Sequence, residues 1–238
     1  MGGLSILHWA IVLLVLGVPL WLIFRSRRAG AGAAQAGMFR DLAPLGQWMR
    51  WFFYAVSALY LVGFFSRNLA PAPVPESDSN SIDVIAAIDV LVFYASLVFF
   101  LRWIYCANVN ARSLGASGMR FTPGWSVGWF FVPVANLVMP YQVMREIWQA
   151  SSNPGNWKGE PVPAKIGAWW GLWWAVTLVS SFESDDPLYA RFAVLALEVL
   201  LIPLLWIQLQ IMDEIQARQM HHRTLSARAL PDKSTTGS

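Results

Sequence analysis

Long uncharged apolar runs alternate with short polar segments along this chain. The first run covers residues 6–24 and contains no charged side chain. A helix of about 19 apolar residues is long enough to cross a hydrocarbon layer of roughly 30 Å. A cleavable signal peptide would carry its basic residues before the run, whereas three arginines follow it here, at residues 25–28. The pattern therefore predicts an N-terminal transmembrane helix at residues 1–28.

Four further apolar runs have the length of a membrane span. They cover approximately residues 48–65, 84–105, 165–182 and 188–211. All five runs together predict an all-α membrane protein with five transmembrane helices. The small, flexible residues at 29–46 predict a cytoplasmic linker. Residues 47–223 are expected to form a four-span membrane domain, and residues 224–238 a disordered cytoplasmic tail.

The apolar stretch at residues 121–151 is interrupted by proline. Pro123, Pro133 and Pro140 each remove a backbone donor and disfavour helix in the residue before them. The residues from 126 to 140 would reach only roughly 22 Å as a helix, which is less than the roughly 30 Å of the hydrocarbon layer. We therefore expect a re-entrant or interfacial segment that enters the membrane without crossing it.

The residues that follow Pro140 predict an amphipathic helix. Tyr141, Met144, Ile147 and Trp148 recur at helical spacing on one face, and polar residues occupy the other positions. We expect this helix to lie in the cytoplasmic interface of the membrane, with its apolar face toward the lipid.

The distribution of charge predicts which side of the membrane each loop faces. Cytoplasmic loops of membrane proteins are enriched in Lys and Arg. If the proline-broken segment does not cross, every basic residue except Arg67 and Arg191 lies inside, and the acidic turn at residues 183–186 lies outside. This arrangement predicts a multi-pass protein of the bacterial cytoplasmic (inner) membrane, with its N-terminus outside and its C-terminus in the cytoplasm.

The composition agrees with membrane insertion. Of the 238 residues, 56% are hydrophobic and 13% are charged, against roughly 25% charged in soluble domains. The 14 tryptophans are typical of side chains at the membrane–water interface. The net charge of +3 comes from dispersed basic residues, which argues against nucleic-acid binding. The lipid bilayer is therefore the first predicted partner.

Fixed spacings of Trp, Pro, Asn and Gly connect the middle of the chain to a known family. The segment LRWIYCANVNARSLG is followed by FTPGWSVGWFFVPVANLVMPYQVMREIWQAS. Over about residues 47–223 the chain resembles the bacterial membrane family named domain of unknown function DUF4328. The matching residues are Trp103, Asn110, Ala111, Arg112, Pro123, Gly124, Trp125, Gly128, Trp129, Pro133, Asn136, Pro140, Tyr141, Glu146, Trp148 and Ser151. The resemblance implies a multi-span membrane protein with no assigned chemistry.

Charged residues inside the predicted spans are candidates for function. Glu198 lies near the middle of the last span, where a charged side chain costs roughly 2.5 to 3.5 kcal/mol on insertion scales. Arg191 lies two turns before it on the same face, and Asp89 lies in the span at residues 84–105. These residues predict either a buried pair that fixes helix register, which we favour, or a path for a proton, cation or small solute.

Polar residues also gather around the proline-broken segment. The amides of Asn108, Asn110 and Asn136 are placed to satisfy backbone groups that Pro123 and Pro133 leave unpaired, which lipid cannot do. The other interpretation is an anionic-lipid headgroup site at the inner surface, formed by Arg112, Arg120 and Arg145.

A pair of glycines predicts a contact with another helix. Gly167 and Gly171 are four residues apart, and such spacing lets two membrane helices approach closely. The three histidines and the single cysteine form no catalytic or metal-ligand pattern, so we expect no enzyme activity, no cofactor and no metal site. The sequence favours a non-enzymatic membrane module that scaffolds or regulates a membrane-protein partner or a second copy of itself. The alternative is a small transporter or channel that uses Asp89 and Glu198.

Overall fold

The computed structural model describes residues 39–69, 79–181 and 186–229 of the 238-residue chain. The predicted first span at residues 6–24 lies outside the described residues. The described residues form helices and contain no strand, so the predicted all-α class is confirmed for this part of the chain.

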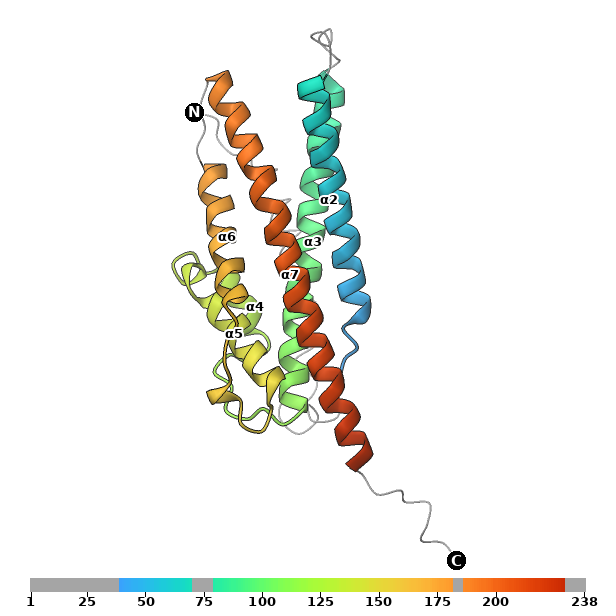
Figure 1. Cartoon of the computed structure of the whole chain (residues 1–238), viewed down its shortest axis with the longest axis vertical. Coiled ribbons are helices and arrows are strands. Elements are labelled where there is room, and N and C mark those ends of the chain that lie inside the picture. The colour runs from blue at the N-terminus through green and yellow to red at the C-terminus, as the bar shows by residue number, and fades with distance from the viewer. Residues whose placement is uncertain (1–38, 70–78, 182–185, 230–238) are drawn as a thin grey trace, which may run out of the picture.

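Four long helices form the body of the molecule (Figure 1). They are α2 (Ala43–Leu69), α3 (Ser79–Ser113), α6 (Ala164–Ser181) and α7 (Pro187–Ala229). α2 packs along α3 and α6 packs along α7, and α2 also contacts α7. The four predicted helical runs are therefore confirmed as helices, and they are arranged as two pairs.

Two of the domain boundaries differ from those predicted. α2 begins at Ala43, inside the predicted linker at 29–46, because Asp41 accepts a hydrogen bond from the Ala43 backbone N–H at 2.9 Å and Pro44 occupies the first turn. α7 continues to Ala229, beyond the start of the tail that we predicted to be disordered from residue 224. Residues 230–238 of that tail lie outside the described residues.

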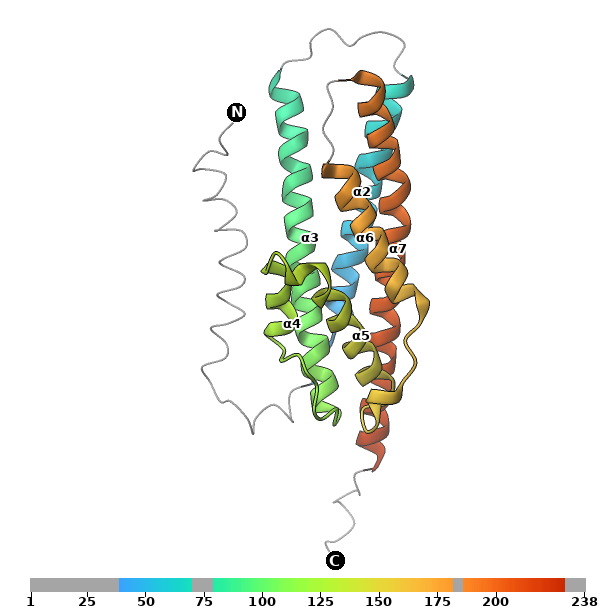
Figure 2. The ribbon, with the colours of Figure 1, turned by 90° about the vertical axis from the view of Figure 1, so that its left-hand side faces the viewer.

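Short elements replace a continuous helix where the prolines fall. They are α4 (Trp125–Gly128), η3 (Trp129–Phe131) and η4 (Ala135–Leu137), followed by the longer α5 (Met139–Ser152) and by η5 (Trp157–Gly159). Pro133 separates η3 from η4, and Pro140 lies in the first turn of α5, where its missing N–H has no intrahelical acceptor to lose. The predicted interruption of the helix is confirmed. Figure 2 shows this segment beside the lower half of the four long helices.

The proline-broken segment begins and ends at the same end of the bundle. Trp157, which follows α5, donates a hydrogen bond from Nε1 to the Ser117 carbonyl, which precedes the segment, at 2.9 Å. The Lys158 ammonium also lies 3.7 Å from where a side chain at Gly118 would begin. The loops on either side of residues 121–151 are therefore neighbours.

α5 is more deeply buried than a helix lying on a membrane surface would be. Ile147 and Trp148 are buried within the protein and do not face lipid as predicted, and Glu146 and Gln149 are only 7% and 6% exposed. The helix contacts α3, α6 and α7. The expectation that its polar side chains would face the aqueous interface is wrong for Glu146 and Gln149, because these side chains bond to the backbone of neighbouring loops.

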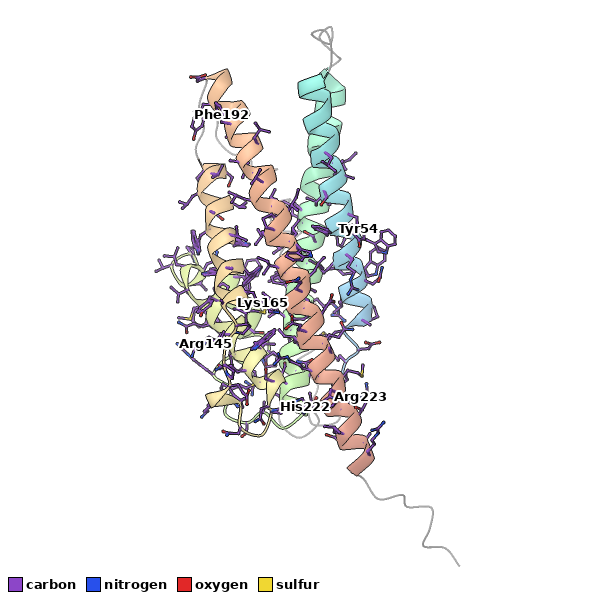
Figure 3. The ribbon with its side chains drawn as sticks, viewed as in Figure 1. Tyr54, Arg145, Lys165, Phe192, His222 and Arg223 are labelled. Carbon is purple, nitrogen blue, oxygen red and sulfur yellow. The ribbon has the colours of Figure 1, made fainter. Side chains whose placement is uncertain are left out.

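Two helical stretches among the described residues have the length and apolarity that crossing a membrane requires. They are Leu91–Ser113 in α3 and Leu195–Arg228 in α7. Large apolar side chains also cover the outside of the bundle, among them Leu91 and Val199, at 68% and 70% exposed. Figure 3 shows Tyr54 on α2 and Phe192 near the start of α7 directed away from the bundle. Such a surface matches lipid better than water.

Candidate functional site

The turn that follows α3 is held between α3 and α5 by three polar side chains. Glu146 accepts the backbone N–H groups of Arg120 and Phe121, at 2.9 and 3.0 Å. From the other side, Asn108 donates to the Phe121 carbonyl at 3.0 Å, and Arg112 donates to the same carbonyl at 2.9 Å. Arg112 also donates to Asn108 Oδ1 at 3.0 Å and to the Met119 carbonyl at 3.1 Å. We call Asn108, Arg112 and Glu146 the turn clamp.

The turn clamp explains why these residue types occur at these positions. Pro123 removes a backbone donor, and the turn at residues 119–121 has carbonyl and N–H groups outside any helix. Asn108 and Arg112 are one helical turn apart, so both can reach the same loop. A carboxylate is the acceptor that can take two N–H groups at once. The prediction that Asn108 satisfies backbone groups near a proline agrees with this geometry.

A second buried network joins the start of the described chain to three helices. Asn110 accepts a hydrogen bond from the Arg40 backbone N–H and donates to the Arg40 carbonyl, both at 2.8 Å. It also donates to Gln219 Oε1 at 3.0 Å, and the Gln219 amide donates to the Ala107 carbonyl and the Ser151 hydroxyl, both at 2.9 Å. Asn110, Ser151 and Gln219 have no solvent exposure. We call these three residues the amide network.

Trp148, three residues before Ser151 of the amide network, has two cations over its ring. The Arg218 guanidinium lies 4.3 Å from the Trp148 ring centroid, and the Lys165 ammonium lies 5.1 Å from it. Lys165 also pairs with Glu214, and Arg218 donates to the Ser152 hydroxyl. Because Trp148 is 2% exposed, these cation–π contacts lie largely out of water, where they are strongest.

The three arginines of the predicted lipid-headgroup site have different surroundings. The Arg112 guanidinium is bonded to Asn108 and to two backbone carbonyls. Arg120 is exposed and donates to Gln142 Oε1 at 2.9 Å. Arg145 is exposed on the outer side of the α4–α5 region (Figure 3). An anionic headgroup would therefore have Arg120 and Arg145 available, while Arg112 serves the turn clamp.

The aromatic motif residues of α4 pack on one another. Trp125 and Trp129 have ring centroids 5.0 Å apart. A side chain at Gly128 would begin 3.1 Å from Cε3 of Trp125, so the small residue leaves room for this ring. Pro123 and Gly124, which precede them, are buried.

Asn136 behaves differently from the role that we predicted for it. Its Oδ1 is buried and has no hydrogen-bond partner among the described residues. Contrary to the prediction, Asn136 Oδ1 therefore satisfies no backbone donor near Pro133. Asn110 also differs from the prediction, because it bonds to the Arg40 backbone and to Gln219 and not to the broken segment.

The remaining predicted site residues lie outside these networks. Gly167 and Gly171 are exposed, and a side chain at either would begin with no atom within 4 Å, so the face they form is open within this chain. The side chains of Asp89, Arg191 and Glu198 lie outside the described residues, although their backbones belong to α3 and α7.

Sequence reasoning missed the partners that α7 and the segment before α2 supply. Gln219 and Arg218 lie in a polar stretch of sequence that predicted only a helix end and a tail, so nothing in the local pattern distinguished a buried glutamine from its exposed neighbours. Arg40 lies in the predicted linker. Among the described residues, no three His, Cys, Asp or Glu side chains are grouped so that they could hold a metal ion.

The arrangement is suited to holding elements together. The polar side chains of the turn clamp and the amide network bond to one another or to backbone groups of the same chain. Buried networks of this kind fix the positions of the elements they join when their groups are satisfied.

Comparison with known proteins gives one match. The model of the family described as Domain of unknown function (DUF4328) matches residues 67–201, which is more than half of the chain. No curated protein and no solved structure matches the chain. The matched range contains the turn clamp and Asn110, whereas Gln219 lies beyond it. On this match the chain belongs to the DUF4328 family.

Proposed function

We propose that this protein is a five-span, non-enzymatic module of the bacterial cytoplasmic membrane that scaffolds or regulates a membrane partner. Residues 6–24, α2, α3, α6 and α7 are its spans, and the proline-broken segment enters the membrane without crossing. The contact between Trp157 and Ser117 carries this topology, because it joins the loops before and after the broken segment.

The scaffold role is supported by how three of the polar family-motif residues are used. Asn110, Arg112 and Glu146 each make at least two hydrogen bonds to the protein itself. A catalytic group in an empty site would instead face a cavity with free hydrogen-bonding capacity. These residues hold one end of the bundle rigid and leave the open face of α6 to meet a partner.

We assign the partner contact to the face of α6 that carries Gly167 and Gly171. Both glycines are exposed, and Ala164 and Ala168 are exposed on the same helix. In lipid, close backbone approach at small residues is a main source of helix–helix attraction. The partner is therefore a transmembrane helix, from another protein or from a second copy of this chain.

Purification from bacterial membranes in mild detergent tests this assignment. The double substitution Gly167→Leu/Gly171→Leu should remove a membrane protein, or a second tagged copy, that co-purifies with the wild type. The matched control is Ala55→Leu/Ala58→Leu, which enlarges two exposed small residues on α2. An identical set of co-purified proteins from all three forms would contradict the proposal.

A small transporter or channel is the second candidate. A cavity between the two helix pairs favours it, since solute paths run between helices. In this case Asp89 and Glu198 carry a proton, cation or small solute, and Glu198→Gln should abolish flux in proteoliposomes. Unchanged flux in that variant would leave the scaffold role as the better account.

A further inference from the structure

A cavity of about 480 Å³ lies between the helix pairs. Its walls come from α2, α3, α6 and α7, and they are mostly aliphatic and aromatic. The broken segment bounds it at one end. There the rings of Phe130 and Phe100 are 6.2 Å apart, and the Leu137 carbonyl accepts a hydrogen bond from Trp170 Nε1 at 3.1 Å. The volume is in the range of small-molecule sites, which is roughly 300 to 1,000 Å³.

None of the described residues that line this cavity is charged. Its polar lining residues are Ser96, Asn136, Thr177, Ser180 and Gln208. The three hydroxyls each donate to a carbonyl of their own helix. The hydroxyl oxygens can still accept, so the two amides are the side chains that can offer a ligand both a donor and an acceptor. Among the described lining residues a charged ligand would find no counter-charge.

The two amides offer complementary hydrogen-bonding groups. Asn136 Oδ1 is a buried acceptor without a partner among the described residues. Gln208 is 8% exposed, and its Oε1 accepts from Trp169 Nε1 at 3.2 Å, so its N–H groups are what it can offer a ligand. A buried unpaired acceptor is unfavourable, and a bound donor removes that cost.

We propose that the cavity binds a neutral single-chain lipid that ends in a hydroxyl group, the class of long-chain alcohols and monoacylglycerols. On binding, the Asn136 side chain turns its buried Oδ1 toward the cavity and accepts from the hydroxyl, and Gln208 Nε2 donates to the hydroxyl. The alkyl chain lies along the apolar walls. This inference rests on the proposed membrane location, which makes such lipids available.

Photolabelling of the full-length protein in phosphatidylcholine nanodiscs tests the ligand class. The probes are hexadecanol and hexadecane, each carrying a diazirine. Recovery of the protein in the nanodisc fraction tests the membrane location separately. The hexadecanol probe should label peptides that contain cavity residues, and it should do so more strongly than the hexadecane probe.

Three variants of the protein make the test specific. Val92→Trp fills the cavity and should abolish this labelling, whereas Leu91→Trp, at the exposed neighbouring position, should leave it unchanged. Asn136→Leu removes the acceptor and should weaken hexadecanol labelling by roughly fivefold to tenfold, the loss expected for one hydrogen bond, without changing that of hexadecane. The thermal midpoint of each variant reports whether it folds.

Two results would overturn the proposal. In the first, both probes label lipid-facing peptides equally, and Val92→Trp changes neither. In the second, a photoreactive amino acid at Phe53, in the cavity wall, cross-links to a peptide from residues 1–38 or to a second copy of the chain. That result would make the cavity a site for a protein segment.

Discussion

At the scale of single residues, Glu146 is the acceptor on which the turn after α3 depends. It is 7% exposed and accepts two backbone N–H groups. Arg112 and Asn108 hold the same turn from the opposite side. Two backbone N–H groups would lose a charged acceptor if the carboxylate were replaced, and a buried donor that loses its partner is costly.

We expect Glu146→Gln to lower the free energy of unfolding by about 1 to 3 kcal/mol, because hydrogen bonds to a charged acceptor are replaced by weaker neutral ones. Arg145→Gln, at the exposed neighbouring position, should change it by less than about 0.5 kcal/mol. Thermal unfolding in detergent, followed by circular dichroism, measures both. Equal midpoints for the two variants would show that the turn clamp does not stabilise the fold.

At this scale the sequence predicted some roles and not others. Asn108 was predicted to satisfy backbone groups near a proline, and it donates to the Phe121 carbonyl. Arg112 was predicted for a headgroup site, and it donates to that same carbonyl. The unpaired oxygen of Asn136 could not be predicted in the same way, because the sequence does not show that the helix breaks into two separate 3-10 turns on either side of Pro133. Gln219 could not be assigned to the amide network, because its partners lie more than 60 residues away in sequence.

At the scale of elements, α5 shows that polar side chains at helical spacing do not always face water. Glu146 and Gln149 lie three residues apart on the helix, and Asn153 follows its last residue. Glu146 bonds to the turn after α3, and Gln149 and Asn153 bond to Glu160 in the following loop. Prolines and loops create backbone groups that need such partners. Helical periodicity alone cannot distinguish side chains that serve this purpose from side chains that face water.

Cross-linking tests whether the broken segment begins and ends at the same end of the bundle. In a Ser117→Cys/Lys158→Cys protein, a short bismaleimide should join the two cysteines within one chain, because the loops that carry them are in contact. The control pair is Ser117→Cys/Ser180→Cys, with Ser180 near the other end of α6. Protease digestion and mass spectrometry identify the product. No product from the first pair, or equal yields from the two pairs, would contradict the contact.

At the scale of the whole molecule, two helix pairs are joined at one end and carry exposed apolar side chains along their length. The turn clamp and the amide network lie at the joined end, together with the loops that flank the broken segment. Apolar run length was enough to predict the four long helices, because backbone groups in lipid must be satisfied within a helix. It could not predict the pairing of α2 with α3 and of α6 with α7, because apolar patterns do not specify which helices touch.

The central claim is that this chain lies in a membrane and that its proline-broken segment does not cross. Thiol labelling of Asn156→Cys and Asp186→Cys, each in a Cys106→Ser background, tests it directly, since both positions are exposed and lie on either side of α6. In intact spheroplasts, a membrane-impermeant maleimide should label Asp186→Cys at once and should label Asn156→Cys only after the membrane is permeabilised. Labelling of Asn156→Cys before permeabilisation would place that loop outside and contradict the five-span account.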